Sequence, residues 1–133
     1  MSEKPEIRNP KSESMTEGTN PKVYDLEERT AMFGEAVIRY VRTLKRDAIT
    51  TPLLNQVVRS ATSIGANYLE TDDAESKKDF RHKISLCRKE SKETKHWLRM
   101  IAAASPEQRE QLKPLWQEAK ELNLIFGAIL RKK

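Results

Sequence analysis

The stretch from Arg59 to Phe80, RSATSIGANYLETDDAESKKDF, decides the fold of this chain. Its first half is rich in small residues, and small side chains allow neighbouring helices to approach closely. The acidic run Glu70-Thr71-Asp72-Asp73 follows, and Ser76 and Asp79 then stand at the spacing of a capping box, which marks the start of a helix. The stretch therefore predicts the end of one helix, a tight acidic turn and the start of a second helix.

Apolar residues recur at helical spacing in four segments of the chain. We expect the first helix over residues 25–46, the second from residue 51 to about 69, the third from residue 76 and the fourth from residue 105. Thr51 and Ser105 are the predicted N-caps, because a proline follows each of them at the first helical position. Pro114 falls inside the fourth segment and predicts a kink or a restart of that helix.

The third segment carries the clearest apolar pattern. Its core positions alternate by four and three over three heptads, which is typical of the packing seam of a helical bundle. Four amphipathic helices with short loops and no strand candidate predict an all-α fold, an antiparallel up-down four-helix bundle. The core positions of the third segment are Phe80, Ile84, Cys87, Ser91, Thr94, Leu98 and Ile101.

The first 24 residues differ in composition from the rest of the chain. They contain three of its six prolines and almost no apolar residues, so we expect a disordered N-terminal tail over 1–24 and the bundle over 25–133. This start also lacks the apolar core of a signal peptide, and no segment has the roughly 20 apolar residues that span a bilayer. A single cysteine, Cys87, fits a reducing compartment. We therefore expect a cytoplasmic protein.

The net charge of +5 is concentrated in the third helix. Residues 76–100 hold nine Lys or Arg and three acids, a net charge of +6, whereas the tail is neutral overall. Cations follow the core positions of this helix at an offset of one residue, or about 100° of rotation, so they form a continuous stripe beside the core. Such a stripe can bind phosphate groups. The candidate nucleic-acid-binding residues are Lys77, Arg81, Arg88, Lys92, Lys95 and Arg99.

A solvated face is the alternative interpretation of this stripe. Acids of the first and fourth helices could neutralise part of it, and the stripe has no interleaved exposed aromatic residues, which argues against a stacking platform for single strands. Leu86, Trp97 and Met100 lie on the outer side of the same helix. They either pack under the fourth helix or are covered by a second subunit. The acids in question are Glu27, Glu28, Glu35, Glu118 and Glu121.

A second candidate site lies at the end of the second helix. Asn67 and Glu70 are one helical turn apart and, with Arg59, could form a small polar pocket. The alternative is that Asn67 and Glu70 satisfy backbone groups at the helix end.

The sequence offers little for other chemistry. His82 and His96 have no Cys or carboxylate at ligand spacing, so we expect no metal site. Cys87 occupies a core position and has no base beside it, and no nucleophile–base pair or glycine-rich phosphate loop is visible. We therefore expect neither enzymatic activity nor a cofactor. Gly34, Gly65 and Gly127 lie inside helices and predict close helix crossings.

The chain resembles the small four-helix-bundle proteins related to the 23S ribosomal RNA intervening-sequence protein. The resemblance covers about residues 25–131 and is carried by Ser63-Ile64, Asn67 and Glu70, the start Ser76-Lys77-Lys78-Asp79-Phe80, and the segment KETKHWLRM. It implies a bacterial four-helix bundle that in some relatives forms a pentameric ring, with no established enzymatic activity. A more distant branch comprises accessory proteins of diversity-generating retroelements, which are basic pentamers that engage reverse transcriptase and nucleic acid.

From these observations we predict a non-enzymatic homo-oligomer, a pentamer by resemblance, that binds RNA or a ribonucleoprotein through the stripe. The alternatives are a protein-interaction scaffold or accessory subunit without nucleic-acid contact, and an enzyme whose site forms only between subunits around the polar pocket. Phosphate binding weakens steeply with salt whereas an apolar interface does not, so salt dependence separates the first two functions.

Overall fold

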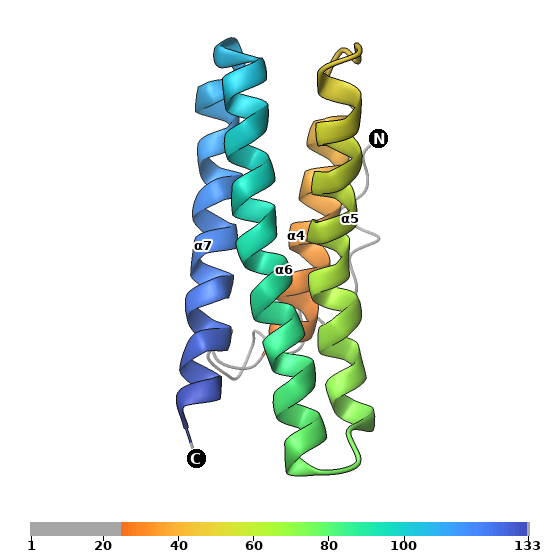
Figure 1. Cartoon of the computed structure of the whole chain (residues 1–133), viewed down its shortest axis with the longest axis vertical. Coiled ribbons are helices and arrows are strands. Elements are labelled where there is room, and N and C mark those ends of the chain that lie inside the picture. The colour runs from red at the N-terminus through yellow and green to blue at the C-terminus, as the bar shows by residue number, and fades with distance from the viewer. Residues whose placement is uncertain (1–24, 133) are drawn as a thin grey trace.

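Four helices make up the part of the chain that the computed structural model describes, residues 25–132. They are α4 (Leu26–Val41), α5 (Thr50–Leu69), α6 (Lys77–Ala104) and α7 (Arg109–Arg131), with short 3-10 turns at Glu70–Asp73 and Pro106–Gln108. The helices alternate in direction, and α4 and α5 lie on one side of the bundle with α6 and α7 on the other (Figure 1). No strand occurs in residues 25–132. The predicted antiparallel up-down bundle is confirmed, and the predicted tail lies outside the described residues.

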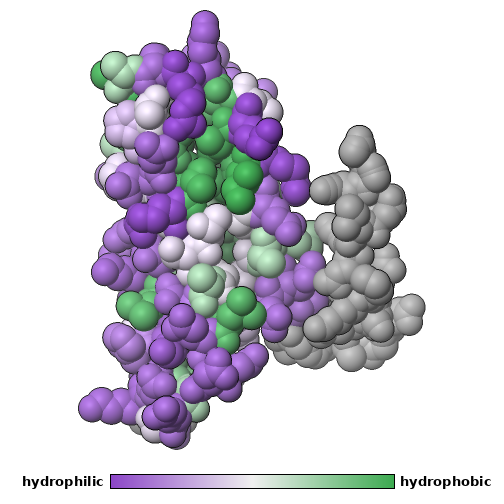
Figure 2. Space-filling model, turned by 90° about the vertical axis from the view of Figure 1, so that its right-hand side faces the viewer, coloured by the Kyte–Doolittle hydropathy of each residue, from purple (hydrophilic) through white to green (hydrophobic). Residues whose placement is uncertain are grey.

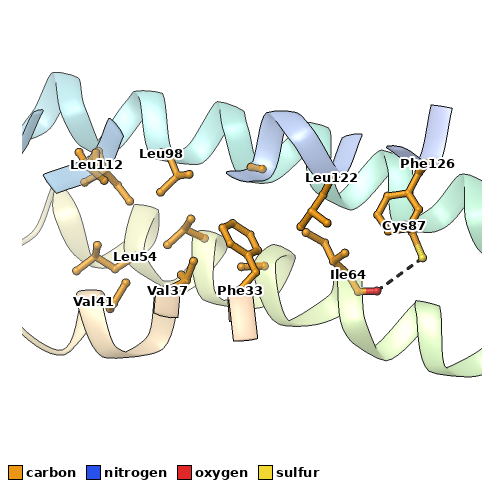
Figure 3. Packing of buried hydrophobic residues seen from close by; sticks show 14 of the residues in the cluster. Phe33, Val37, Val41, Leu54, Ile64, Cys87, Leu98, Leu112, Leu122 and Phe126 are labelled. Atoms are coloured by element: carbon orange, nitrogen blue, oxygen red, sulfur yellow. Dashed lines mark hydrogen bonds between the residues drawn. The ribbon is translucent and has the colours of Figure 1, made fainter. Parts of the chain in front are cut away.

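The core runs along the axis of the bundle and receives side chains from all four helices (Figure 3). Six of the seven predicted core positions of α6 are buried, and Phe80 is half-buried at the end of the row. The middle of the row is narrow, because Ser91 and Thr94 stand where larger apolar residues would otherwise pack. Their hydroxyls donate to carbonyls one turn earlier, and Ser60 Oγ lies 2.8 Å from Thr94 Oγ1. Burial of these polar groups is therefore compensated by hydrogen bonds.

Two of the three helical glycines allow α4 and α5 to pack closely. A Cβ on Gly34 would lie 3.5 Å from the Thr62 Cα, and one on Gly65 would lie 3.3 Å from the Thr30 Oγ1. The predicted close crossing is confirmed for this pair of helices. At Gly127 a Cβ would meet only the Arg131 Nη1, at 3.5 Å, so this glycine marks no crossing.

Of the helix pairs that are neighbours around the bundle, α4 and α7 have the least extensive contact. Arg29 joins α4 to α7, and Tyr40 joins α4 to the 3-10 turn that precedes α7. The Arg29 guanidinium donates to Glu118 at 2.7 and 2.9 Å and to Glu121 at 3.2 Å, and the Tyr40 hydroxyl donates to Gln108 Oε1, just before α7, at 2.7 Å. Two of the acids that could have neutralised the stripe are thus paired with α4.

Several predicted helix ends are wrong in detail. Helix α4 ends at Val41 rather than near residue 46. The amides of Thr43 and Leu44 donate to carbonyls three residues back instead of four, and the Thr43 hydroxyl also donates to the Tyr40 carbonyl. Helix α5 begins at Thr50, so Thr51 is not its N-cap. The N-cap is Ile49, whose side chain makes no cap bond, and the Asp47 carboxylate instead accepts bonds from the amides of Ile49 and Thr50 at 2.9 and 2.8 Å.

The predicted caps of the last two helices are confirmed only in part. Ser76 Oγ accepts a bond from the Asp79 amide at 3.0 Å, as expected, but Asp79 returns to the Glu75 amide instead of the Ser76 amide. Ser105 makes no side-chain cap bond, and a 3-10 turn separates it from α7. Helix α7 continues through Pro114 without a restart.

Candidate nucleic-acid interface

The predicted stripe follows the seam between α6 and α7. Arg81 donates to the carbonyls of Leu130 and Lys132 at 2.7 and 3.2 Å, where a cation is favourable because carbonyls at a helix C-terminus carry partial negative charge. The Arg88 carbonyl accepts a bond from Asn123 Nδ2 at 2.9 Å. These contacts set the register of the two helices and place the cations of α6 next to α7.

An open depression lies where the two helices meet, near the C-terminal end of α7. It has a volume of about 650 Å³ and is lined by four Lys or Arg side chains, one histidine and no acid. Arg81 and Arg88 belong to the predicted set, and α7 contributes Arg131. Gly127 also lines the depression and presents no side chain to it. The full lining is Lys78, Arg81, His82, Ser85, Arg88, Gly127, Leu130 and Arg131.

The ion pairs that α6 makes with other elements lie toward α5 and the turn that follows it, not at this seam. Lys83 pairs with Glu70 at 3.3 Å, and Asp79 lies at 4.0 Å from the same ammonium group. Arg59 of α5 pairs with Glu90 and Glu93 of α6 at 3.3 and 2.8 Å. Consequently Arg88, Lys92 and Arg99 have no ion-pair partner among residues 25–132, and their charge is not neutralised by the fold. Lys77 of the predicted stripe is not counted among these unpaired cations, because it has an interaction partner, as does Glu28.

One aromatic residue lies on the seam, contrary to the expectation from α6 alone. The Trp116 ring of α7 is half-buried, with Lys95 Nζ at 5.5 Å and Lys120 Nζ at 5.6 Å from its centre. Both distances are within the range of a cation–π interaction. The sequence places Trp116 at the edge of the apolar row of α7 with Lys120 one turn later, but only the register between the helices brings Lys95 beside them.

Other residues on the outer side of α6 are half-buried toward α5. Trp97 packs against the core, forms an edge-on contact with His96 at 5.0 Å between ring centres, and lies near Gln56 of α5. The Trp97 Nε1 is buried without a hydrogen-bond partner in the described part of the chain. Lys92 lines the same shallow surface as Trp97, so the predicted stripe widens here beyond the seam.

The residues of the predicted polar pocket have separate partners. Arg59 bonds to Glu90 and Glu93, Asn67 Nδ2 donates to the Ser63 carbonyl at 3.0 Å, and Glu70 pairs with Lys83. None of these bonds joins two of the three residues. The Asn67 bond agrees with its alternative interpretation, which is the satisfaction of a backbone group of α5.

A second surface covers the side formed by α4 and α5. Apolar and small residues form a strip between polar margins on this side (Figure 2), and a groove of about 370 Å³ runs between the two helices. Its floor includes Gly34 and Gly65, and Ile38 and Leu69 remain 39% and 50% exposed at its sides. Glu27, Glu28 and Glu35 also line it, so this side differs from the α6–α7 seam in both charge and polarity.

Other kinds of site have little support in residues 25–132. Burial raises the pKa of Cys87 to about 12, and its thiol donates to the Ile64 carbonyl at 3.6 Å, so it is a neutral core residue (Figure 3). No group of three or more His, Cys, Asp or Glu in this part could hold a metal ion. None of its helices is both long and apolar enough to span a membrane.

Known proteins support the fold and the resemblance drawn from the sequence. Residues 24–128 match the family described as 23S rRNA-intervening sequence protein. A crystal structure of a protein of unknown function from the S23 ribosomal protein family of Bacteroides thetaiotaomicron is similar, with a TM-score of 0.74 and 27% identity over 81% of this chain and all of that one. No curated protein shows significant similarity. The chain belongs to the 23S rRNA-intervening sequence protein family.

Proposed function

We propose that this protein is a non-enzymatic, oligomeric four-helix bundle that binds RNA or a ribonucleoprotein through the α6–α7 seam. The observation that carries the proposal is the separation of charge. The ion pairs across the bundle join Arg29 to Glu118 and Glu121, Arg59 to Glu90 and Glu93, and Lys83 to Glu70, whereas Arg88, Lys92 and Arg99 have no acidic partner among residues 25–132. Unpaired cations along one face supply affinity for a phosphate backbone, largely independent of sequence. The family description refers to 23S rRNA, so structured RNA is the first ligand to test.

We also propose that the groove between α4 and α5 contacts a second copy of the chain. It offers exposed apolar side chains on the side of the bundle formed by the other two helices, so both surfaces could be used at once. The pentamer that the resemblance implies requires one surface to bind a different surface of the next subunit, because a ring of five is built from head-to-tail contacts.

Charge reversal in the stripe tests the RNA-binding function. We expect Arg88→Glu with Lys92→Glu to weaken binding of a structured RNA roughly tenfold or more at about 0.1 M salt, because two phosphate contacts become repulsive. Both residues are exposed, so circular dichroism should show unchanged helix content. Arg39→Glu with Lys45→Glu is the matched control, since it removes the same charge from exposed positions at the end of α4 and the following turn. Equal loss in both variants would leave only a net-charge effect and contradict the proposed site.

A protein-interaction scaffold is the second candidate, and the apolar α4–α5 groove is the observation that favours it. Increasing salt separates the two functions. Binding to a single-stranded RNA through five phosphates should lose affinity with a slope of about −3.5 in a plot of log K against log salt, whereas an apolar contact has little salt dependence. Purified protein that retains a protein partner at high salt but binds no RNA at low salt would favour the scaffold.

A further inference from the structure

We infer that Trp116 is a stacking platform for an unpaired RNA base and that the adjoining depression binds phosphates of the same strand. The inference rests on the proposed RNA-binding function and narrows its ligand to single-stranded RNA or an unpaired loop. Trp116 comes from α7, and its ring lies beside Lys95 of α6 and Lys120 of α7. One face thus combines an aromatic surface with cations from two helices, which is the pairing of groups that single-strand binding sites use.

The two ammonium groups do not preclude stacking. Each lies 5.5–5.6 Å from the ring centre at the end of a flexible side chain, and neither Lys95 nor Lys120 forms an ion pair within residues 25–132. A nucleotide can therefore place its base on the ring while the ammonium groups move to its phosphates. The cations that approach the ring in the free protein become the phosphate contacts of the complex.

The depression lies on the same face of α7 as Trp116. Gly127 is 11 residues after Trp116, which is close to three full turns and corresponds to about 16 Å along the helix axis. This distance equals roughly five nucleotides at the rise of a stacked strand. Arg81, Arg88 and Arg131 line the depression together with Gly127. A short strand with a base on Trp116 can thus reach these guanidinium groups with its phosphates.

Duplex RNA lacks half of this interaction. Its bases are stacked on one another inside the helix, so a duplex offers phosphates to the cations but no free base face to Trp116. Trp116 should therefore contribute to binding of single strands and contribute little to binding of duplexes. A purely electrostatic seam would not make this distinction.

The experiment compares an oligouridine of about ten nucleotides with an RNA duplex of similar length, using Trp116→Leu and Trp116→Phe in the full chain. We expect Trp116→Leu to weaken oligouridine binding at least about fivefold and to change duplex binding less than about twofold. Trp116→Phe should retain most of the single-strand affinity, because phenylalanine keeps an aromatic face. Thermal melts verify that each variant is folded, since Trp116 also packs against the core.

A second measurement does not depend on removal of this side chain. The chain has two tryptophans, so Trp97→Phe leaves Trp116 as the only indole fluorophore. We expect oligouridine to quench its fluorescence in proportion to binding and duplex RNA to quench it much less. Lys89→Glu, an exposed change on α6 outside the lining of the depression, serves as a variant with altered charge and an intact platform.

The possible outcomes distinguish this inference from the function on which it rests. Oligouridine binding without quenching, with equal affinity in Trp116→Leu, overturns the platform and leaves RNA binding through charge. Failure of the wild-type protein to bind either RNA overturns both. Binding to vesicles of phosphatidylserine and phosphatidylcholine without RNA binding overturns both as well, and would assign the seam to an anionic membrane surface.

Discussion

The three helical glycines show how one residue type takes different roles in different surroundings. Gly65 is held against α4, because the Thr30 hydroxyl that a Cβ would approach is fixed by bonds to the carbonyls of Leu26 and Glu27 at 2.8 and 3.1 Å. Gly127 faces only the flexible end of Arg131. The sequence predicted close crossings at all three glycines, and it could not separate these cases because the opposing atoms belong to distant segments.

Replacement by alanine should separate the two environments. Gly127→Ala is expected to raise the free energy of unfolding by about 1 kcal/mol, since alanine is the better helix former and no fixed atom opposes its Cβ. Gly65→Ala should show no gain or a loss, because the new methyl group meets a buried hydroxyl that cannot move freely. Urea denaturation of both variants measures the difference. An equal gain in the two proteins would show that the contact with Thr30 relaxes without cost.

At the scale of the helix, apolar periodicity was the reliable signal and end chemistry was not. The four-and-three pattern of α6 predicted its buried row because the pattern depends only on the helix itself. The N-caps depended on which nearby side chain could reach the free amides, and Asp47 reached those at the start of α5 from the connection between the first two predicted helices. Gln108, just before α7, accepts a bond from Tyr40 of α4, a contact made only when the bundle forms.

Asp47 should make the start of α5 sensitive to acid. Bonds from the amide and hydroxyl of Thr50, and then from the Ile49 amide, hold the pKa of Asp47 below its ordinary value of 3.8. A carboxylate with a lowered pKa in the folded state stabilises the protein above its unfolded pKa, and this contribution is lost as the pH falls through the folded pKa. Asp47→Ala should therefore melt at a lower temperature than wild type at pH 7, and the difference should shrink as the pH falls below about 4.

Thr51, which the sequence predicted as the N-cap of α5, provides the control for this experiment. Thr51→Ala removes a side chain that makes no cap bond, so it should change the melting temperature less than Asp47→Ala and show no such pH dependence. A constant deficit of Asp47→Ala from pH 7 to pH 3 would contradict the carboxylate cap, since the protonated side chain would then contribute as much as the charged one.

At the scale of the whole molecule, the bundle separates two surfaces that the sequence could only partly resolve. The cations of α6 were visible because they share one helix. The contributions of Trp116, Lys120 and Arg131 were not, because they require the register of α6 against α7 that Arg81 and Asn123 help to set. The α4–α5 groove was likewise hidden, since its floor is made of small residues that give no apolar signal of their own.

The α4–α5 groove should control assembly independently of RNA binding. Ile38→Glu with Leu69→Glu places two charges at the sides of the groove, where both side chains are already exposed in the single chain, so the fold should persist. If a second copy covers these residues, their charges become buried without partners, and such burial is strongly unfavourable. Size-exclusion chromatography with light scattering should then show a large particle for wild type and a smaller one for the double variant.

Leu124→Glu is the matched control, because Leu124 is 59% exposed on α7 and does not line the groove. It should leave the particle mass unchanged. Ribonuclease treatment before chromatography distinguishes assembly by protein contacts from assembly on RNA, since only the second loses mass together with nucleic-acid absorbance. A wild-type monomer would contradict the groove as a subunit contact but would leave the cationic seam as a complete site, because every residue of the seam belongs to α6 and α7 of one chain.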